Sequence, residues 1–305
     1  MAVKLHPLPI TELKDHFGLA LRENEALARY TSSRIGGPAD ALIEVHSAEE
    51  LSQVAAKLWE LGLPFMLLGG GSNVLVSDEG VREVVILNHA RKVQFRDDGV
   101  WAESGASLGV IARQAARKGL SGLEWAAGIP GTLGGAVVGN AGAHGGDMAA
   151  VLSMAEILHQ EKGRQKLSTE DLEFGYRQSW LKFHTDEALL LSADLRLTPA
   201  KEAAIKEKMD SFLSYRRLTQ PPGASMGSMF KNPPDDHAGR LIEAAGLKGK
   251  RVGDAQISPL HANFFLNLGE AKAADVHALI KEAQSQVSAQ FGVELELEIG
   301  LVGEW

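Results

Sequence analysis

Cysteine is absent from the 305 residues of this chain. Disulfide bonds, thiolate nucleophiles and cysteine-based metal or iron–sulfur sites are therefore excluded. Long runs of Lys or Arg are also missing, and the net charge is −8, from 39 acidic and 31 basic residues. A general nucleic-acid binder needs a positive surface, so we expect no nucleic-acid partner. We also expect no metal site.

Signals for export or membrane insertion are lacking as well. The segment 1–7 has neither the basic start nor the apolar core of a signal peptide. One uncharged run, 125–146, is long enough to cross a bilayer, but eight of its 22 residues are Gly and one is Pro. So much glycine makes a poor membrane helix. We therefore expect a cytoplasmic protein without a membrane partner.

Glycine, in contrast, is plentiful at 33 residues, and it gathers in two segments, 69–73 and 128–142. Glycine lets the backbone approach a ligand closely, and successive N–H groups can bind a pyrophosphate. From local sequence alone, 69–73 is equally compatible with a hairpin turn. Neither a Walker loop nor a Rossmann glycine motif opening a helix is present. Two separate glycine-rich segments therefore favour a flavin dinucleotide bound outside the Rossmann class.

Alternating apolar patterns predict an α+β or mixed α/β fold. The expected helices are 47–62, 108–118, 198–217, 237–245 and 271–291. The expected strands are 64–68, 74–77, 82–87, 100–103, 151–159, 189–197, one ending at 266, and 294–302. Ser47 with Glu50 predicts a capping box, and Thr198 followed by Pro199 predicts a helix start. The best candidate domain boundary lies near 200–220.

Three polar residues have ordinary explanations when taken alone. Ser228 follows a glycine and fits a turn, and Arg177 fits an exposed position near a strand end. Glu298 ends a strict alternation that places three glutamates on one face of a predicted strand. Periodicity does not distinguish it from Glu294 and Glu296.

Seven motifs, in order, carry a resemblance to a known family. They are Arg34–Asp40, Leu68–Leu75, Gly128–Ala136, Asn140–Gly146, Tyr176–Ser179, Gly227–Pro233 and His261–Asn263. Together they resemble the UDP-N-acetylenolpyruvoylglucosamine reductase (MurB) family of peptidoglycan synthesis. The first three resemble the wider flavoprotein fold of vanillyl-alcohol-oxidase type, and the last three indicate the reductase.

The resemblance implies an α+β fold with an FAD-binding domain of vanillyl-alcohol-oxidase (PCMH) type over residues 1–200. This domain would contain two subdomains with a boundary near 88–92 and would be completed by the strand 293–305. A C-terminal α+β substrate-binding domain would cover 201–292. The family also implies non-covalent FAD, NADPH as co-substrate and a UDP-sugar substrate, in a monomer.

The implied reaction reduces the enolpyruvyl ether of UDP-N-acetylglucosamine to UDP-N-acetylmuramate. Hydride would pass from NADPH to the flavin N5 and then to the enolpyruvyl methylene carbon. Ser228 matches the proton donor for the adjacent carbon, because a carbanion beside a carboxylate is a strong base. Arg177 matches an arginine that stabilises this carboxylate. Glu298 matches a glutamate that polarises the serine or positions a proton.

The resemblance also implies binding residues. Those expected to bind FAD are Arg34, Gly36, Leu68, Gly69, Gly70, Gly71, Ser72, Asn73, Val74, Leu75, Gly128, Pro130, Gly131, Thr132, Gly134, Gly135, Asn140, Ala141, Gly142, His144 and Gly146. Those expected to bind substrate are Tyr176, Arg216, Gln220, Lys231, Asn232, His261 and Asn263. His144 is expected near FAD as a loop residue and not as a covalent tether.

The chain departs from the family pattern at Gly300, where a basic or polar residue is usual, and at Met226, where a small residue is usual. It also resembles the shorter subclass, which lacks a tyrosine-bearing insertion. Two alternatives stay open. One is another FAD oxidoreductase of the same fold with a different substrate. The other is a nucleotide-sugar-binding protein without catalysis.

Overall fold

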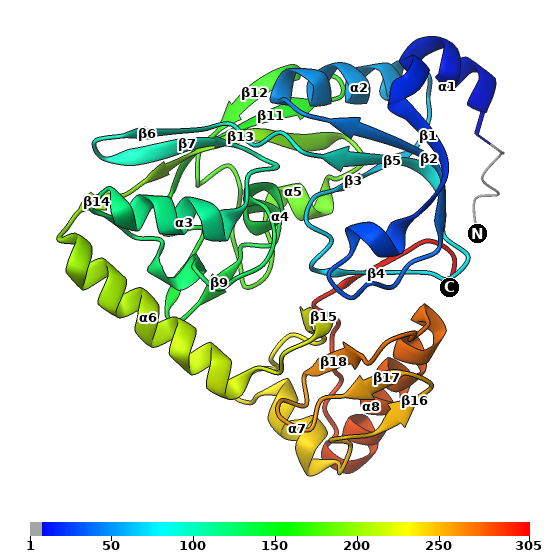
Figure 1. Cartoon of the computed structure of the whole chain (residues 1–305), viewed down its shortest axis with the longest axis vertical. Helices are drawn as coiled ribbons and strands as arrows, with labels where there is room; N and C mark the ends of the chain where they lie inside the picture. Colours follow the sequence, from blue (N-terminus) through cyan, green and yellow to red (C-terminus); the bar gives the residue numbers. More distant parts are fainter. Residues whose placement is uncertain (1–7) are drawn as a thin grey trace.

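The computed structural model of the chain describes residues 8–305. The segment 1–7, which was judged not to be a signal peptide, lies outside this range. Two sheets with their helices form the larger part of the molecule, and a smaller C-terminal part lies at one end (Figure 1). Within 8–305 no helix combines the length and hydropathy needed to cross a membrane.

The first sheet has the order β1-β2-β5-β3, formed by Leu21–Ala26, Pro38–Val45, Val81–Asn88 and Phe65–Leu68. Strands β2, β5 and β3 are parallel. Continuous apolar runs such as Val84–Leu87 are buried, as parallel strands covered on both faces require. The connecting helix α2, Ala48–Glu60, begins at Ser47, whose hydroxyl accepts from the N–H of Glu50 at 3.1 Å. Glu50 accepts from His46 and not from Ser47, so only half of the predicted capping box forms.

The second sheet is antiparallel, with the order β12-β11-β13-β7-β6. Its strands are Gly163–Leu167, Leu152–His159, Ala188–Arg196, Gly99–Glu103 and Val93–Arg96. Helices α3, Leu108–Arg117, and α4, Leu133–Val138, cover it through buried residues such as Ile111 and Leu133. The predicted elements 100–103, 108–118, 151–159 and 189–197 are confirmed here.

The glycine-rich run 125–146 forms no long helix. It forms the end of a short 3-10 helix (η3), Glu124–Ala126, then α4 and the two-residue strands β9, Gly142–Ala143, and β10, Gly146–Asp147. Thr132 begins α4, since its hydroxyl accepts from the N–H of Gly135 at 3.3 Å. Small residues let this chain pack closely beneath the second sheet.

The predicted helix start at Thr198 is wrong. Thr198–Pro199 form the strand β14, which pairs with β8, Leu120–Ser121. The helix α6 begins only at Glu202 and ends at Thr219. An available strand partner keeps the backbone extended, and the N–H of Ala200 continues the pairing by donating to Gly119 at 2.8 Å. Helix α6 then runs along one side of the molecule to the C-terminal part (Figure 1).

The C-terminal part is a four-stranded antiparallel sheet in the order β15-β18-β17-β16. The strands are Ala224–Ser228, Phe264–Asn267, Ala255–Ile257 and Arg251–Val252, and the helices are α7, Ala238–Ala244, and α8, Ala273–Phe291. Phe230, Phe265 and Leu279 belong to one buried core. The predicted helices 237–245 and 271–291 are confirmed.

The last segment returns to the first part of the molecule. Only Gly300–Val302 (β19) form a strand, parallel to β4, Val74–Val76, so the predicted strand 294–302 is too long. Before it, Leu297 makes a single antiparallel bridge to Phe230. The segment contacts two different partners in succession, which limits each pairing to a few residues. Leu295 and Ile299 are nevertheless buried, so the predicted alternation of side chains is preserved.

The predicted division into domains 1–200 and 201–292 stays a prediction. Helix α6 packs through Ile205 and Met209 against Ala116 and Ala127, residues of the part that carries the second sheet. Residues 202–219 therefore contact the region expected to bind FAD, although they follow the expected boundary in sequence.

The N-terminus of α8 is capped from a distant loop. The Asp78 carboxylate accepts from the N–H groups of Ala273 and Ala274 at 2.8 and 2.9 Å. A carboxylate at this position satisfies unpaired N–H groups and interacts favourably with the helix dipole. Asp78 thereby connects the loop after β4 to the C-terminal part.

We expect Asp78→Ala to lower the free energy of unfolding by about 1 kcal/mol, the usual value of an N-terminal cap. Urea denaturation measures this. Asp210→Ala provides a control at an exposed position of α6 and should change stability little. Equal stability of the two variants would contradict the capping role.

Candidate functional site

The two glycine-rich segments lie against one another. A Cβ at Gly70 would stand 3.2 Å from the Cα of Gly131, and one at Gly69 would stand 2.6 Å from Thr132 Oγ1. The hydroxyl of Ser72 donates to the carbonyl of Pro130 at 3.3 Å. The predicted segments 69–73 and 128–135 therefore form one surface, and the close contact requires glycine.

The loop that contains Arg34 and Gly36 joins this surface. The N–H of Ser32 donates to the carbonyl of Gly71 at 2.9 Å. Gly71 has φ +56°, and a Cβ there would stand 2.0 Å from the Tyr30 carbonyl oxygen. The three segments expected to bind the cofactor thus converge from the first sheet and from the loop before α4.

This surface fits an anionic dinucleotide. Among residues 8–305, no acceptor receives a hydrogen bond from the backbone N–H groups of 70–73. A row of such free donors on close-packed glycines is an anion-binding arrangement. The residues present therefore suit the pyrophosphate of FAD, with Gly69–Asn73 and Gly131–Gly135 as its expected contacts. Leu68, Val74 and Leu75 lie in the strands that flank the first loop.

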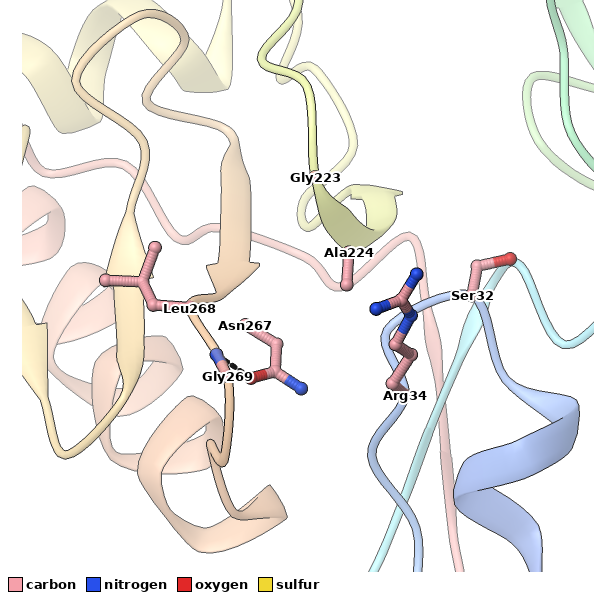
Figure 2. Close-up of a pocket in the computed structure, with 7 residues that line it drawn as sticks. All are labelled: Ser32, Arg34, Gly223, Ala224, Asn267, Leu268 and Gly269. Atoms are coloured by element: carbon pink, nitrogen blue, oxygen red, sulfur yellow. Dashed lines mark hydrogen bonds between the residues drawn. The ribbon is translucent and has the colours of Figure 1, made fainter.

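An open cavity of about 500 Å³ lies where the first part of the molecule meets the C-terminal part. Figure 2 shows Ser32 and Arg34 on one side and Asn267, Leu268 and Gly269 on the other. Asn267 also donates to the carbonyl of Ser33 at 2.9 Å, which joins the two sides. Arg34 is therefore exposed to this cavity, with φ +58°.

The segment 140–146 connects the glycine-rich surface to Arg177. The buried side chain of Asn140 donates to the carbonyl of Gly175 at 2.9 Å and accepts from the N–H of Ala149 at 3.1 Å. The carbonyl of Gly142 accepts from Arg177 Nη2 at 3.2 Å. Gly146 lies so close to Trp125 that a Cβ would stand 2.4 Å from its ring.

His144 stacks against helix α6. Its ring lies 4.2 Å from that of Phe212, almost parallel at 3°, and meets Tyr215 edge-on at 5.7 Å. Burial lowers the pKa of His144, and the nearby charge of Arg216 lowers it further. The ring therefore favours its neutral form and holds α6 beside the loop of β9.

Arg177 and Glu298 form an ion pair between distant segments. Arg177 Nε lies 2.8 Å from Glu298 Oε1, and the side chains are 23% and 18% exposed. Burial raises the pKa of Glu298, whereas the guanidinium of Arg177 opposes this shift. Arg177 itself has φ +57°, an uncommon conformation for a residue with a side chain. Strain and a perturbed carboxyl at one place are typical of functional sites.

Ser228 lies beside this pair at the end of β15. The N–H of Glu298 donates to the carbonyl of Met229 at 2.9 Å, which places the glutamate next to the residue that follows Ser228. No described residue hydrogen-bonds to the Ser228 hydroxyl, so it is available to a ligand. The three residues expected to catalyse the reaction thus come together from three separate segments.

Some of the residues expected to bind substrate lie close to Arg177, Glu298 and Ser228. Tyr176 is exposed, lies 5.4 Å from the Arg177 guanidinium and accepts from the N–H of Asn232 at 3.3 Å. Lys231 pairs with Glu296 at 2.8 Å. The Asn232 side chain accepts from the N–H of Ala238, at the start of α7.

Asn263 and His261 have structural partners. The buried carboxamide of Asn263 accepts from the N–H of Phe230 at 2.9 Å and donates to its carbonyl at 2.8 Å. His261 Nδ1 accepts from the N–H of Asn263 at 3.2 Å, and burial lowers the pKa of this histidine. Both residues shape the loop behind Ser228, and their contact with substrate stays a prediction.

Arg216 and Gln220 lie at the C-terminal end of α6. The side chain of Arg216 packs on Gly128, where a Cβ would stand 2.9 Å from its Cδ. Burial lowers the pKa of Arg216. The glycine at 128 is therefore explained by this arginine and by Leu213, and not by a ligand alone.

One polar residue of the site was missed from sequence. Lys182 lies on the short helix α5, Trp180–Phe183, and donates to the carbonyl of Arg177 at 2.9 Å. Burial lowers its pKa, and the charges of Lys231 and Arg177 contribute. In the sequence, Lys182 stands out only by lying five residues after Arg177. The turn between the two residues cannot be predicted from the sequence, so their contact cannot be predicted either.

Two protein families match different parts of the chain. Residues 39–166 match the FAD binding domain family, and residues 218–302 match the family described as UDP-N-acetylenolpyruvoylglucosamine reductase, C-terminal domain. These matches confirm the predicted fold class, an FAD-binding domain joined to a C-terminal α+β domain.

Similar proteins span nearly the whole chain. A Symbiobacterium thermophilum protein named UDP-N-acetylenolpyruvoylglucosamine reductase 2 is 47% identical over 288 residues, which cover 93% of this chain and 92% of that protein. The Chloroflexus aggregans reductase is 42% identical over 95% of this chain and 100% of its own length. The crystal structure of the Thermus caldophilus reductase superposes with a TM-score of 0.81, at 40% identity, over 93% of this chain and 100% of that one.

The glycine-rich surface predicts that Gly71→Ala weakens FAD binding by about tenfold or more, because the new side chain is strained at positive φ and meets the Tyr30 carbonyl. The flavin content and FAD affinity of the purified variant measure this. Gly300→Ala is the matched control, since a Cβ there would make only ordinary contacts, with Val74 Cγ1 at 3.8 Å and the Asn73 carbonyl oxygen at 3.9 Å among the described residues. An FAD affinity equal in both variants would contradict the role of the loop.

The raised pKa of Glu298 makes stability depend on pH. Such a carboxyl contributes stability below its usual pKa of 4.5, and this is lost as the pH rises through the folded-state pKa. Glu298→Gln cannot ionise, so its free energy of unfolding should increase relative to the parent between pH 4.5 and neutrality. Urea denaturation at several pH values tests this.

Glu296→Gln is the control for that measurement. Hydrogen bonding to Lys231 lowers the pKa of Glu296, so its removal should give no gain of stability at neutral pH. If Glu298→Gln instead loses stability as the pH rises, pairing with Arg177 outweighs the burial of the carboxylate.

Proposed function

The chain belongs to the UDP-N-acetylenolpyruvoylglucosamine reductase family, and we propose that it reduces UDP-N-acetylglucosamine enolpyruvate to UDP-N-acetylmuramate with NADPH. One observation supports this above all. Arg177 pairs with Glu298, and the N–H of Glu298 donates to Met229, the residue after Ser228, beside a glycine-rich surface that fits FAD. The proposal includes a monomer in the cytoplasm, acting in peptidoglycan precursor synthesis.

When bound, FAD would supply hydride chemistry, with NADPH as the electron donor. The protein must therefore orient the enolpyruvyl group and stabilise the charge that develops on it. The backbone N–H groups of 70–73 would hold the cofactor, and Gly131–Gly135 would pack beside it, since the N–H groups of Leu133, Gly134 and Gly135 already donate to Ala106, Ser104 and Thr132. The residues proposed to face substrate lie at β15 and in the turn of Arg177.

Arg177 would bind the substrate carboxylate. Its guanidinium is permanently charged and planar, so it suits a carboxylate whose negative charge grows as the adjacent carbon becomes a carbanion. The Gly142 carbonyl accepts a hydrogen bond from its Nη2, and the Glu298 carboxylate lies 2.8 Å from its Nε without hydrogen-bond geometry, so one hydrogen bond and one charge contact restrict its orientation. Such preorganisation lowers the cost of arranging charges during the reaction.

Ser228 would deliver the proton to that carbon. Its hydroxyl makes no hydrogen bond to the described residues and lies on the strand next to the Glu298 segment. A weak acid suffices because the carbanion is a strong base. Glu298 would orient the Ser228 hydroxyl, either directly or through water. It would also help Ser228 to regain the proton that the serine has donated.

The UDP part of the substrate would extend along basic and polar residues. Arg216 and Gln220 at the end of α6, with Lys231 after β15, could bind its diphosphate. Lys231 is held by the exposed Glu296, so a phosphate would compete with this carboxylate. Tyr176, Asn232, His261 and Asn263 complete the proposed wall.

The assay that tests the function follows NADPH oxidation by the FAD-loaded protein. We expect oxidation that depends on UDP-N-acetylglucosamine enolpyruvate and yields UDP-N-acetylmuramate. If NADPH reduces the flavin but UDP-N-acetylglucosamine enolpyruvate is not consumed, the protein is a different FAD oxidoreductase of the same fold. Failure of FAD to be reduced by NADPH would contradict the proposed donor.

Ser228→Ala should retain FAD reduction by NADPH but lower substrate-dependent turnover by about 10²–10⁴-fold, the usual contribution of a proton donor. Ser225→Ala on the same strand is the control and should retain turnover. Stopped-flow measurement separates the two half-reactions. Loss of both in Ser228→Ala would mean that the serine has another role.

A further inference from the structure

Lys182 is a charged residue inside the site for which the proposed mechanism has no role. It is partly buried on α5, and its ammonium group donates to the main-chain carbonyl of Arg177 at 2.9 Å. No carboxylate of residues 8–305 forms an ion pair with it. Even partial burial of a lysine without a paired acid is unfavourable, so the position of Lys182 requires an explanation other than an ion pair.

The hydrogen bond from Lys182 acts on a strained turn. Gly175 and Gln178 bond to each other in both directions, at 3.1 and 3.3 Å, and enclose Tyr176 and Arg177 between them. Arg177 is at φ +57° in this turn, a conformation that costs a residue with a side chain about 1 kcal/mol. The carbonyl that Lys182 binds belongs to this residue, so the lysine opposes relaxation of the turn. The direction of the guanidinium depends on that turn.

The charge of Lys182 acts on the same place. The groups whose charges reach it are Arg177 on the turn, Lys231 after β15, and Glu296 and Glu298 on the returning C-terminal segment. Lys231 is paired with the exposed Glu296, whereas Arg177 is paired with Glu298. Lys182 therefore adds a positive charge that no direct partner neutralises. This charge favours an anion and the ionised form of Glu298.

We propose that Lys182 is a positioning residue for Arg177, holding its turn through the main-chain carbonyl and adding positive charge where the substrate carboxylate is received. This inference rests on the proposed function, because it concerns the binding of that carboxylate. It predicts an effect on the step that consumes substrate and none on the reduction of FAD by NADPH.

Three substitutions separate the hydrogen bond from the charge. Lys182→Met removes both, Lys182→Gln keeps a donor without charge, and Lys182→Arg keeps both. We expect Lys182→Met to lower kcat/KM for the UDP substrate by about 10- to 100-fold, the range for a hydrogen bond to a charged group. Lys182→Arg should recover most of it, and FAD reduction by NADPH should stay within about twofold of the parent.

The pH profile distinguishes a charge from a merely structural contact. Lys182, Arg177 and Lys231 all lower the pKa of Glu298 against the effect of burial. Removing one of these charges raises that pKa, so the acid limb of kcat/KM should move to higher pH in Lys182→Met and Lys182→Gln. It should not move in Lys182→Arg. A loss of packing would lower the rate in all variants without this shift.

Lys206→Met on the exposed face of α6 is the matched control, since within residues 8–305 Lys206 pairs with Glu202, one turn away, and with no other acid. It should leave the rate and the pH profile unchanged. Urea denaturation of each variant checks folding, and Lys182→Gln and Lys182→Arg still test the inference if Lys182→Met does not fold.

The inference is overturned if the parent reduces the UDP substrate but Lys182→Met keeps its kcat/KM, or loses it without a shift of the acid limb. An equal loss in FAD reduction would overturn it as well. A parent protein that does not reduce the UDP substrate refutes the proposed function itself, and the inference with it.

Discussion

The ion pair between Arg177 and Glu298 is the interaction on which the site depends. It connects the turn before α5 to the segment that returns from α8, so the second sheet and the C-terminal part meet there. The same segment bonds to Met229 and then pairs with β4. A displacement of Glu298 would therefore disturb Arg177, the strand that carries Ser228 and the loop at 69–73, whose Asn73 donates its side-chain amide to the Glu298 carbonyl.

Glycine serves a different constraint at the cofactor surface. At Gly69 and Gly71 a Cβ would stand less than 3.0 Å from a neighbouring atom, at Gly70 it would stand 3.2 Å from the Cα of Gly131, and the N–H groups of 70–73 donate to no described residue. Here glycine provides close contact between loops and access for a ligand at the same time. Gly128 is different, since its space is taken by Arg216, a residue proposed to bind substrate.

The site retains features that do not stabilise the folded chain. Glu298 has a raised pKa because it is buried, Lys182 has a lowered pKa for the same reason, and Arg177 adopts a left-handed conformation. Each is unfavourable alone, and they lie within one group. Such local costs are expected where a binding or catalytic arrangement is held ready for a charged ligand, because the surrounding structure compensates for them.

Local composition and the order of motifs were enough to predict the glycine loops, most helices and strands, and the resemblance to the family. The sequence-based prediction misplaced the start of α6 at Thr198 and lengthened the last strand, since both depend on a partner strand elsewhere in the chain. Periodicity also left Glu298 equivalent to Glu294 and Glu296. Only the tertiary structure paired Glu298 with Arg177 and placed Lys182 behind that arginine. Burial and charge pairing are properties of neighbours in space, and these neighbours come from segments far apart in the chain.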